Sequence, residues 1–545
     1  MNKTFITFII TLFFSAYGMG QLAPERYVVF FNTKQGTPYT LTQANEFLSA
    51  RAIENRNKRG IQLDSLDLPV NPEFIDSLNT VVPRVLYTSR WFNFAVVEAS
   101  AEQISDVESF TFVKEFREKK TSQKSLKEQK DSKFELEQQL FFAGDPDSKE
   151  VQEQINLGAL HDFGFFGENV RIAIIDAGFT GLNTMEAFQH LFDENRLIAT
   201  ANFAEDNTVF YGHTHGTSVG SIMCGNLGDN YMGAAPNAEY VLIRSETGST
   251  EYLVEEYNWV AAAEFADSLG VDVINSSLGY TRFDWPAQDH TYDDLDGEST
   301  IISRAAGIAF QKGMLVVVSA GNHGNDSWQY ISVPADHPNV LAVGSVDING
   351  ELSYFSSTGL TSHQFKPNIV ACGEYAPYIS SDIVYNGHGT SYASPLVAGA
   401  AACLWQAFPE KTPGELFDAI QQSSSKKSNP DNLYGYGIPD FFNAYFILNE
   451  SPFMPEDTNE AEIVHAYTDK SENIFMHIYV PESVSGQIRV FDSYGRLVHS
   501  ERCNLKEKRT TKVEIRGLGS GIDSQVLLLN VKGGSVNTTR KIFVE

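Results

Sequence analysis

Three short motifs in the middle of the chain carry a carboxylate, an imidazole and a hydroxyl, in that order. Asp176 follows the apolar run 170–175, His215 opens a run of small residues, and Ser391 opens an Ala-rich run. A carboxylate can orient an imidazole, and that imidazole can take the proton of a serine hydroxyl attacking a carbonyl. The pattern therefore predicts nucleophilic catalysis by Asp176, His215 and Ser391.

These side chains must be positioned by the elements around them. After residue 150, continuous apolar runs alternate with helical ones, which is typical of a doubly wound parallel sheet covered on both faces. The predicted strands are 170–175, 240–243, 271–274, 314–319 and 340–343, and the predicted helices are 215–224, 252–269, 300–311 and 391–408. Asp176 and Asn322 both follow strand ends, so the active crevice is expected at the carboxyl edge of the sheet.

The motifs together resemble those of the subtilisin-like serine peptidases. They are 176–178 (Asp-Ala-Gly), 215–217 (His-Gly-Thr), 389–395 (Gly-Thr-Ser-Tyr-Ala-Ser-Pro) and 316–322, which is similar to the strand ending in the family's oxyanion-hole asparagine. The resemblance implies a peptidase in which Asn322 and the Ser391 N–H stabilise the oxyanion. It also implies two substrate-binding segments, composed of Ser277, Leu278 and Gly279 and of Ser319, Ala320 and Gly321. Ala177 stands where the family usually has Ser or Thr.

Two other patterns in this region predict different chemistry. Residues 216–220 match the Gly-x-Ser-x-Gly nucleophile elbow, although 208–213 is a poor strand to precede one. His213 and His215 could form a metal pair, but no third ligand motif accompanies them. A peptidase-like binding protein without activity and a serine hydrolase acting on esters also remain open.

Composition limits the partners and the number of domains. The 545 residues include 40 Lys and Arg against 69 Asp and Glu, a formal charge of −29. Nucleic acid would repel such a chain, and a basic face for binding membranes is disfavoured. The length predicts two to four domains. The four cysteines, Cys224, Cys372, Cys403 and Cys503, are too few for a disulfide scaffold in a chain of this length. Cys224 and Cys403 fall in apolar helical runs and are interpreted as buried free thiols.

Changes in composition divide the chain into segments. The predicted order is a signal peptide (1–20), an α+β domain (21–118), a linker with the processing site (119–148), a catalytic domain (149–450), a linker (451–460) and a β-rich tail (461–545). Lys3, the apolar stretch 5–14 and a small-residue cleavage site near Gly20 predict export, with a membrane anchor as the alternative. No later segment is apolar and long enough to cross a bilayer, so we expect a secreted or cell-surface protein.

The two flanking domains also resemble known modules. Residues 26–118 are similar to the propeptides of subtilisin-like enzymes, which act as folding templates and inhibitors; an unrelated accessory domain is the alternative. Residues 461–545 resemble the C-terminal sorting domain of type IX secretion substrates of Bacteroidetes, although Asp523-Ser524-Gln525 alters the usual Gly-x-Tyr. That resemblance implies the type IX machinery as a partner, against the alternative of a generic β-sandwich.

One acidic stretch bears on metal binding. Residues 289–298 could hold calcium, which subtilisin-like enzymes often bind, but they lack the full Asp-x-Asp-x-Asp-Gly spacing, and a solvated loop is the alternative. The predicted chemistry itself requires no cofactor.

Overall fold

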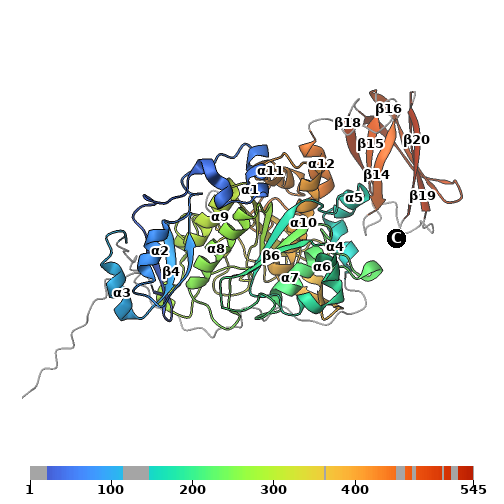
Figure 1. Ribbon diagram of the computed structural model, residues 1–545. Helices are drawn as coiled ribbons and strands as arrows, with labels where there is room; N and C mark the ends of the chain where they lie inside the picture. The colour runs from blue at the N-terminus through green and yellow to red at the C-terminus, as the bar shows by residue number, and fades with distance from the viewer. Residues whose placement is uncertain are drawn as a thin grey trace, which may run out of the picture.

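A computed structural model describes most of the chain (Figure 1). The described residues are 21–114, 146–360, 364–449, 461–468, 474–480, 482–505, 509–516, 526–534 and 536–543. The predicted signal peptide, the linker 451–460 and nearly all of the linker 119–148 lie outside these ranges, as does the altered sorting motif at 523–525.

A seven-stranded parallel sheet forms the centre of the largest body. Its order is β11-β10-β9-β8-β5-β7-β6. The strands are β5 (Arg171–Asp176), β6 (Leu197–Asn202), β7 (Glu239–Arg244), β8 (Val273–Ser276), β9 (Leu315–Ser319), β10 (Val340–Val346) and β11 (Ile369–Cys372). The predicted parallel sheet is confirmed, and β6 and β11 extend it at its two edges.

Helices cover both faces of this sheet. One face packs against α7 (His215–Cys224), α10 (Thr390–Ala407), α11 (Pro413–Ser423) and α12 (Phe441–Leu448), and the other against α8 (Val254–Ser268) and α9 (Ile301–Gln311). Alternation along β5 explains this: Ile172 and Ile174 join the first core, while Ala173 and Ile175 join the second. Both faces are apolar, which is why these strands read as continuous apolar runs. Shorter elements are α4 (Ser148–Gln154), α5 (Leu157–Asp162), α6 (Gln189–Asp193) and the hairpin β12 (Glu374–Ser380) with β13 (Ile383–His388).

The N-terminal body is a four-stranded antiparallel sheet with helices. Its strands, in the order β1-β2-β4-β3, are β1 (Gln21–Ala23), β2 (Arg26–Phe30), β4 (Phe94–Glu98) and β3 (Arg84–Ser89). Its helices are α1 (Ala50–Lys58), α2 (Pro72–Leu78) and α3 (Ala101–Glu108). One face of the sheet, with Val28 and Val96, joins the core of α8 and α9, against which this body lies in Figure 1. The opposite face, with Val29 and Val97, forms a separate core.

The apolar spacing of residues 41–59 predicts a single helix, and the apolar run 110–116 predicts a strand. Both predictions were wrong. The single helix expected over 41–59 is broken, because Ser49 accepts the Ala52 N–H and starts α1 as a new helix. Of the strand expected at 110–116, the structure describes residues 110–114, which form turns with an isolated bridge between Phe31 and Val113.

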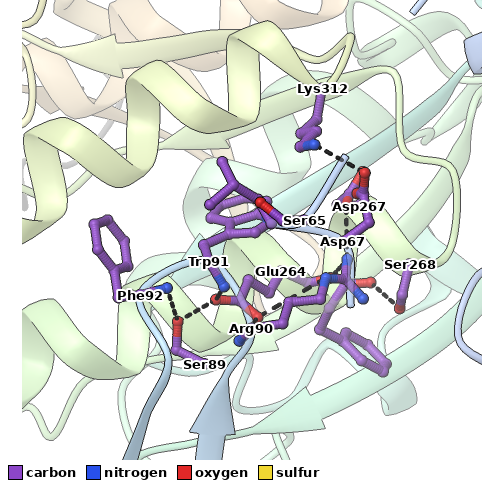
Figure 2. A network of polar contacts seen from close by, with 12 residues as sticks. Ser65, Asp67, Ser89, Arg90, Trp91, Phe92, Glu264, Asp267, Ser268 and Lys312 are labelled. Atoms are coloured by element: carbon purple, nitrogen blue, oxygen red, sulfur yellow. Dashed lines mark hydrogen bonds and ion pairs between the residues drawn. The ribbon is translucent and has the colours of Figure 1, made fainter. Parts of the chain in front are cut away.

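Charged groups join the N-terminal body to α8 and α9 (Figure 2). Glu264 on α8 accepts hydrogen bonds from the backbone N–H groups of Arg90 (2.8 Å) and Trp91 (3.2 Å). Asp267, one turn further, binds Arg56 (2.6 Å) and Arg90 (2.5 Å), and all three side chains are largely buried. The interface therefore combines an apolar contact with buried ion pairs.

The C-terminal region consists of antiparallel strands around one apolar core. One sheet has the order β14-β15-β18 and the other the order β17-β16-β19-β20. The strands are β14 (Glu462–Thr468), β15 (Ile474–Val480), β16 (Val484–Asp492), β17 (Leu497–Leu505), β18 (Arg509–Ile515), β19 (Val526–Gly533) and β20 (Val536–Phe543). The runs 487–492 and 493–498, with Gly495 between them, predict a hairpin with a glycine turn. That hairpin is confirmed as β16 and β17, which turn at Asp492–Arg496.

A buried lysine gives the free energy of unfolding a predicted pH dependence. Lys366 is 4% exposed and donates to His337 O, Val340 O and Asn368 Oδ1, at 2.7–3.0 Å. Burial lowers the pKa of Lys366 to about 7, from 10.5 in the exposed side chain. Between pH 7 and pH 10.5, Lys366 is protonated in the unfolded chain and neutral in the folded one. The free energy of unfolding therefore rises with pH in this range, by at most about 1.4 kcal/mol per pH unit from this group.

The Lys366→Met variant is expected to lack that rise. Urea unfolding between pH 7 and 10 would measure it, in a Ser391→Ala background that prevents self-digestion. The exposed Lys427 supplies the control, since Lys427→Met should keep the wild-type slope. Equal slopes for all three proteins would contradict the assignment.

Candidate active site

Asp176 and His215 meet at the carboxyl edge of the sheet. Asp176 is the last residue of β5, and His215 is the first of α7. His215 Nδ1 lies 2.7 Å from Asp176 Oδ1, and the two residues are 1% and 0% exposed. The same carboxylate oxygen accepts the Ala177 N–H at 2.7 Å. A carboxylate held in this way keeps the proton of a neutral imidazole on Nδ1 and leaves Nε2 to act as the base.

Gly216 explains why α7 can come so close to β5. A Cβ on Gly216 would lie 2.5 Å from the Gly178 carbonyl oxygen and 3.0 Å from Asp176 Cβ. Any side chain here would push the start of α7 away from the strand end. The glycine after the histidine is therefore required by packing.

Ser391 is held by the segment that follows β8. It is the second residue of α10, which packs against α7, and it is 6% exposed. Its carbonyl oxygen accepts a hydrogen bond from Ser277 Oγ (2.9 Å), and its own Oγ lies 3.4 Å from Ser277 O. The candidate nucleophile and the first predicted substrate segment therefore lie side by side.

Asn322 lies on the other side of the α10 N-terminus. Its Oδ1 accepts hydrogen bonds from both the N–H and the Oγ1 of Thr390, each at 2.9 Å. A Cβ on Gly389 would lie 3.4 Å from Asn322 Nδ2 and 3.6 Å from Ser391 N. Two nitrogen atoms thus lie within 3.6 Å of one point beside Gly389, and both carry protons that an oxyanion could accept. A side chain at 389 would occupy that space.

The second predicted substrate segment runs beside the first. Ser319 ends β9, next to β8 in the sheet, and Gly321 N donates to Thr390 Oγ1 at 3.2 Å. Leu278 and Ala320 are buried in the core under the segments. The structure therefore places the predicted residues in two groups. Asp176 and His215 meet at the start of α7, and Asn322 and the two substrate segments meet Ser391 and Thr390 at the start of α10, a helix that packs against α7.

Comparison with known proteins identifies this arrangement. The model of the subtilase family matches residues 167–437, and that of the peptidase S8 propeptide domain of Bacteroidota matches residues 26–135. Subtilisin DY of Bacillus licheniformis is 30% identical over 279 residues, which are 50% of this chain and 89% of the relative. The chain belongs to the subtilase family. Subtilisin E of Bacillus subtilis is 29% identical over 52% of this subtilase and 68% of its own length.

Solved structures give the same range of similarity. The protease domain of PatA is 25% identical to this subtilase. The alignment covers 52% of this chain and 96% of that domain, with a TM-score of 0.42.

Sequence reasoning missed the residues that brace this subtilase's site. Arg244, the last residue of β7, is 2% exposed and donates through Nε to the carbonyls of Ala177 and Glu246, each at 3.0 Å. It therefore fixes the backbone after Asp176. Its signal in the sequence was a charged residue directly after the apolar run 240–243. Thr390, which holds Asn322, stood within a quoted motif but had no assigned role.

The structure gives the competing patterns other roles. Ser218 of the elbow-like pattern lies inside α7 in place of a strand-to-helix turn, so residues 216–220 form no nucleophile elbow. His213 Nδ1 accepts the backbone N–H of His215 at 3.1 Å, which commits that nitrogen to the start of α7.

The acidic stretch 289–298 is organised by its own turns. Asp294 accepts the Thr291 N–H, and Asp296 accepts the N–H groups of Glu298 and Ser299. Within the ranges that the structure describes, the residues grouped closely enough to hold a metal ion lie elsewhere: Glu246, Glu251 and Glu255.

Proposed function

We propose that this subtilase is a secreted serine endopeptidase that hydrolyses peptide bonds through Asp176, His215 and Ser391. The observation that carries the proposal is the buried 2.7 Å contact between His215 Nδ1 and Asp176 Oδ1. An imidazole oriented by a carboxylate acts as a base when a serine hydroxyl and oxyanion donors lie near it. Ser391 and Asn322 lie at the start of α10, which packs against α7.

In the proposed reaction, Ser391 Oγ attacks the substrate carbonyl carbon while His215 Nε2 takes its proton. Asp176 stabilises the imidazolium that forms. The carbonyl oxygen becomes negative and is bound by Asn322 Nδ2 and the Ser391 N–H. Collapse of this intermediate breaks the C–N bond, and the imidazolium protonates the leaving amine. A water molecule, deprotonated by His215, then cleaves the acyl-enzyme ester and restores Ser391.

Substrate binding is proposed at the two segments that flank Ser391. An extended peptide would pair with the backbone of 277–279, and the side chain before the cut bond would enter between this segment and 319–321. Ser277 thus supports both the substrate strand and Ser391. The triad uses no cofactor in this scheme, and any calcium would act on stability.

A fluorophosphonate probe tests the proposal. It reacts with an activated serine, so we expect one labelled peptide containing Ser391 and no label in Ser391→Ala. Comparison of rates on matched peptide and ester substrates tests the peptidase assignment. Labelling at Ser218, or at no serine in a protein freed of its N-terminal domain, would overturn the proposal.

The N-terminal domain is proposed to act as an inhibitor that is cut from the enzyme within 119–148. Its sheet covers α8 and α9, and its arginines bind buried carboxylates there. N-terminal sequencing of the secreted enzyme should find a mature start between about residues 117 and 150. A mature chain that began at Gln21 would contradict this processing.

The Asp267→Asn variant is expected to weaken retention of the cut N-terminal domain. Asp267 is 3% exposed and binds two arginines, so removing its charge leaves them in a buried site with less compensation. We expect dilution to release peptidase activity at about 10²-fold higher protein concentration than in the wild type. Asp418→Asn, an equal change at an exposed position of α11, should have no effect. Equal release curves for the two variants would contradict the prediction.

Export is proposed to use the N-terminal signal and the C-terminal region, with the type IX machinery as partner. No helix in the part of the chain that the structure describes has the length and hydropathy to cross a bilayer. Deletion of residues 455–545 is expected to retain the protein inside the cell or periplasm. Normal export of the shortened chain would count against this route.

A further inference from the structure

The α1 segment of the N-terminal domain places two arginines against the amino edge of the central sheet, the edge opposite Asp176. Asp272, which directly precedes β8, binds both of them. Its Oδ2 accepts from Arg51 Nη2 at 2.7 Å, and its Oδ1 accepts from Arg59 Nη2 at 2.5 Å. Asn55 donates to the same Oδ1 at 3.0 Å. Positions 51, 55 and 59 are each four residues apart, so the three side chains form one stripe along the helix.

Backbone carbonyls and an aromatic ring complete a separate site for each guanidinium. Arg51 also donates to the carbonyls of Asn169 (2.6 Å) and Gly270 (3.1 Å). The other arginine donates to Gly313 O (3.1 Å), and its guanidinium carbon lies 4.2 Å from the centre of the Trp405 ring. A planar guanidinium suits several fixed acceptors and stacks on an aromatic face, whereas a lysine ammonium lacks the planar fork. These groups form the arginine cradle: the carboxylate of Asp272, the carbonyls of Asn169, Gly270 and Gly313, and the ring of Trp405.

The catalytic domain holds the cradle in place by itself. The Arg171 N–H, at the start of β5, donates to Asp272 Oδ2 at 2.9 Å, and the Asp272 N–H donates to Arg171 O. Gly270 and Gly313 lie in the turns that follow α8 and α9, so the carboxyl ends of both helices point to this edge and favour positive charge there. Departure of α1 would therefore leave a formed site that lacks its two cations.

We propose that the released enzyme uses the arginine cradle to bind an arginine-bearing helix of a protein partner. The partner presents two arginines eight residues apart on one face, the spacing of Arg51 and Arg59. This inference rests on the proposed function, because the N-terminal domain must be cut off and leave before another helix can enter. The six residues of β5 separate the cradle from Asp176 by about 17 Å, so the bound helix would not touch the triad.

The test uses a fluorescent peptide of residues 45–60 and the processed enzyme, freed of its N-terminal domain and inactivated with a fluorophosphonate to protect the peptide. Anisotropy at physiological salt should show saturable binding. The uncut Ser391→Ala chain should bind at least about tenfold more weakly, because its own α1 fills the cradle. A peptide with Arg51→Lys and Arg59→Lys keeps the charge and should also bind at least about tenfold more weakly.

Asp272→Asn tests the cradle from the side of the enzyme. It removes the carboxylate charge that both guanidinium groups share, so the Kd of the peptide should rise at least about tenfold. Asp418→Asn is the control, because it makes the same change at an exposed position of α11 and should leave the Kd unchanged. In enzyme that has not been inactivated, saturating peptide should leave the initial rate on a peptide anilide unchanged, since the cradle is remote from the triad.

The outcomes separate this inference from the proposed function. Equal binding of the arginine and lysine peptides, or an equal Kd for Asp272→Asn and wild type, would overturn the cradle while Ser391 labelling keeps the peptidase assignment. If Asp272→Asn does not fold, the two peptides still decide, because they leave the enzyme unchanged. Failure of the fluorophosphonate to label Ser391 would overturn the peptidase assignment, and the peptide comparison would then test the cradle alone.

Discussion

Replacing Ser391 with alanine is expected to lower kcat on peptide substrates by about 10⁶-fold, the size of loss known for the equivalent change in subtilisin. The hydroxyl is the only group of the proposed triad that bonds to the substrate, so its loss removes the covalent route. The oxyanion donors at Asn322 and the Ser391 backbone would remain and support a slow attack by water. Initial rates on casein and on a peptide anilide measure the effect.

Ser218→Ala is the matched control for this experiment. It makes the same substitution at another buried serine, on α7, and it removes the hydroxyl of the rival elbow pattern. We expect Ser218→Ala to keep peptidase activity within about tenfold of wild type. Full activity in Ser391→Ala, or loss of activity in Ser218→Ala with an intact Ser391 label, would refute the assignment of the nucleophile.

The Asp176→Asn variant is expected to lose about 10⁴-fold in kcat. Asp176 Oδ1 accepts from both His215 Nδ1 and the Ala177 N–H, and the carboxylate charge stabilises the imidazolium. An amide of the same shape removes that charge and can place its NH₂ against Nδ1, which selects the wrong tautomer. The fold should be preserved, so the test is kcat together with the rate of fluorophosphonate labelling, which should fall in parallel.

Asp229→Asn is the control for this charge change. Asp229 is exposed on the turn that follows α7, so neutralising it alters the net charge equally without touching the site. It should retain the wild-type kcat. Comparable losses in the two variants would indicate a general electrostatic effect and contradict a specific role for Asp176.

The central sheet could be predicted because its strands are buried on both faces. β9, with five fully buried residues, appears in the sequence as one apolar run. The edge strand β6, at 197–202, has partly exposed residues throughout, so it lacks that signal. β11 is only four residues long and was also missed. The helix break at Ser49 depended on a capping hydrogen bond within an otherwise helical pattern.

The reactive residues of the site could be predicted from the sequence, whereas the residues that hold them in position could not. Each motif places its reactive side chain next to a strand end or helix start, which is local information. The contacts of Arg244 with Ala177 and of Thr390 with Asn322 join positions 67 and 68 residues apart. Ser332 Oγ likewise lies close to both Gly279 and Gly321, so three stretches that are distant in the sequence meet there. A local sequence pattern does not predict contacts between residues that lie so far apart in the chain.

The proposed release of the N-terminal domain would separate the ion pairs that join this domain to α8. Arg56 and Arg90 would leave with the N-terminal domain, while Glu264 and Asp267 stay on the enzyme. After this separation, the carboxylates of Glu264 and Asp267 would be exposed to solvent without the arginines that neutralise them in the full chain. The enzyme without its N-terminal domain should therefore bind to an anion-exchange resin through this acidic surface of α8, which the N-terminal domain covers in the precursor.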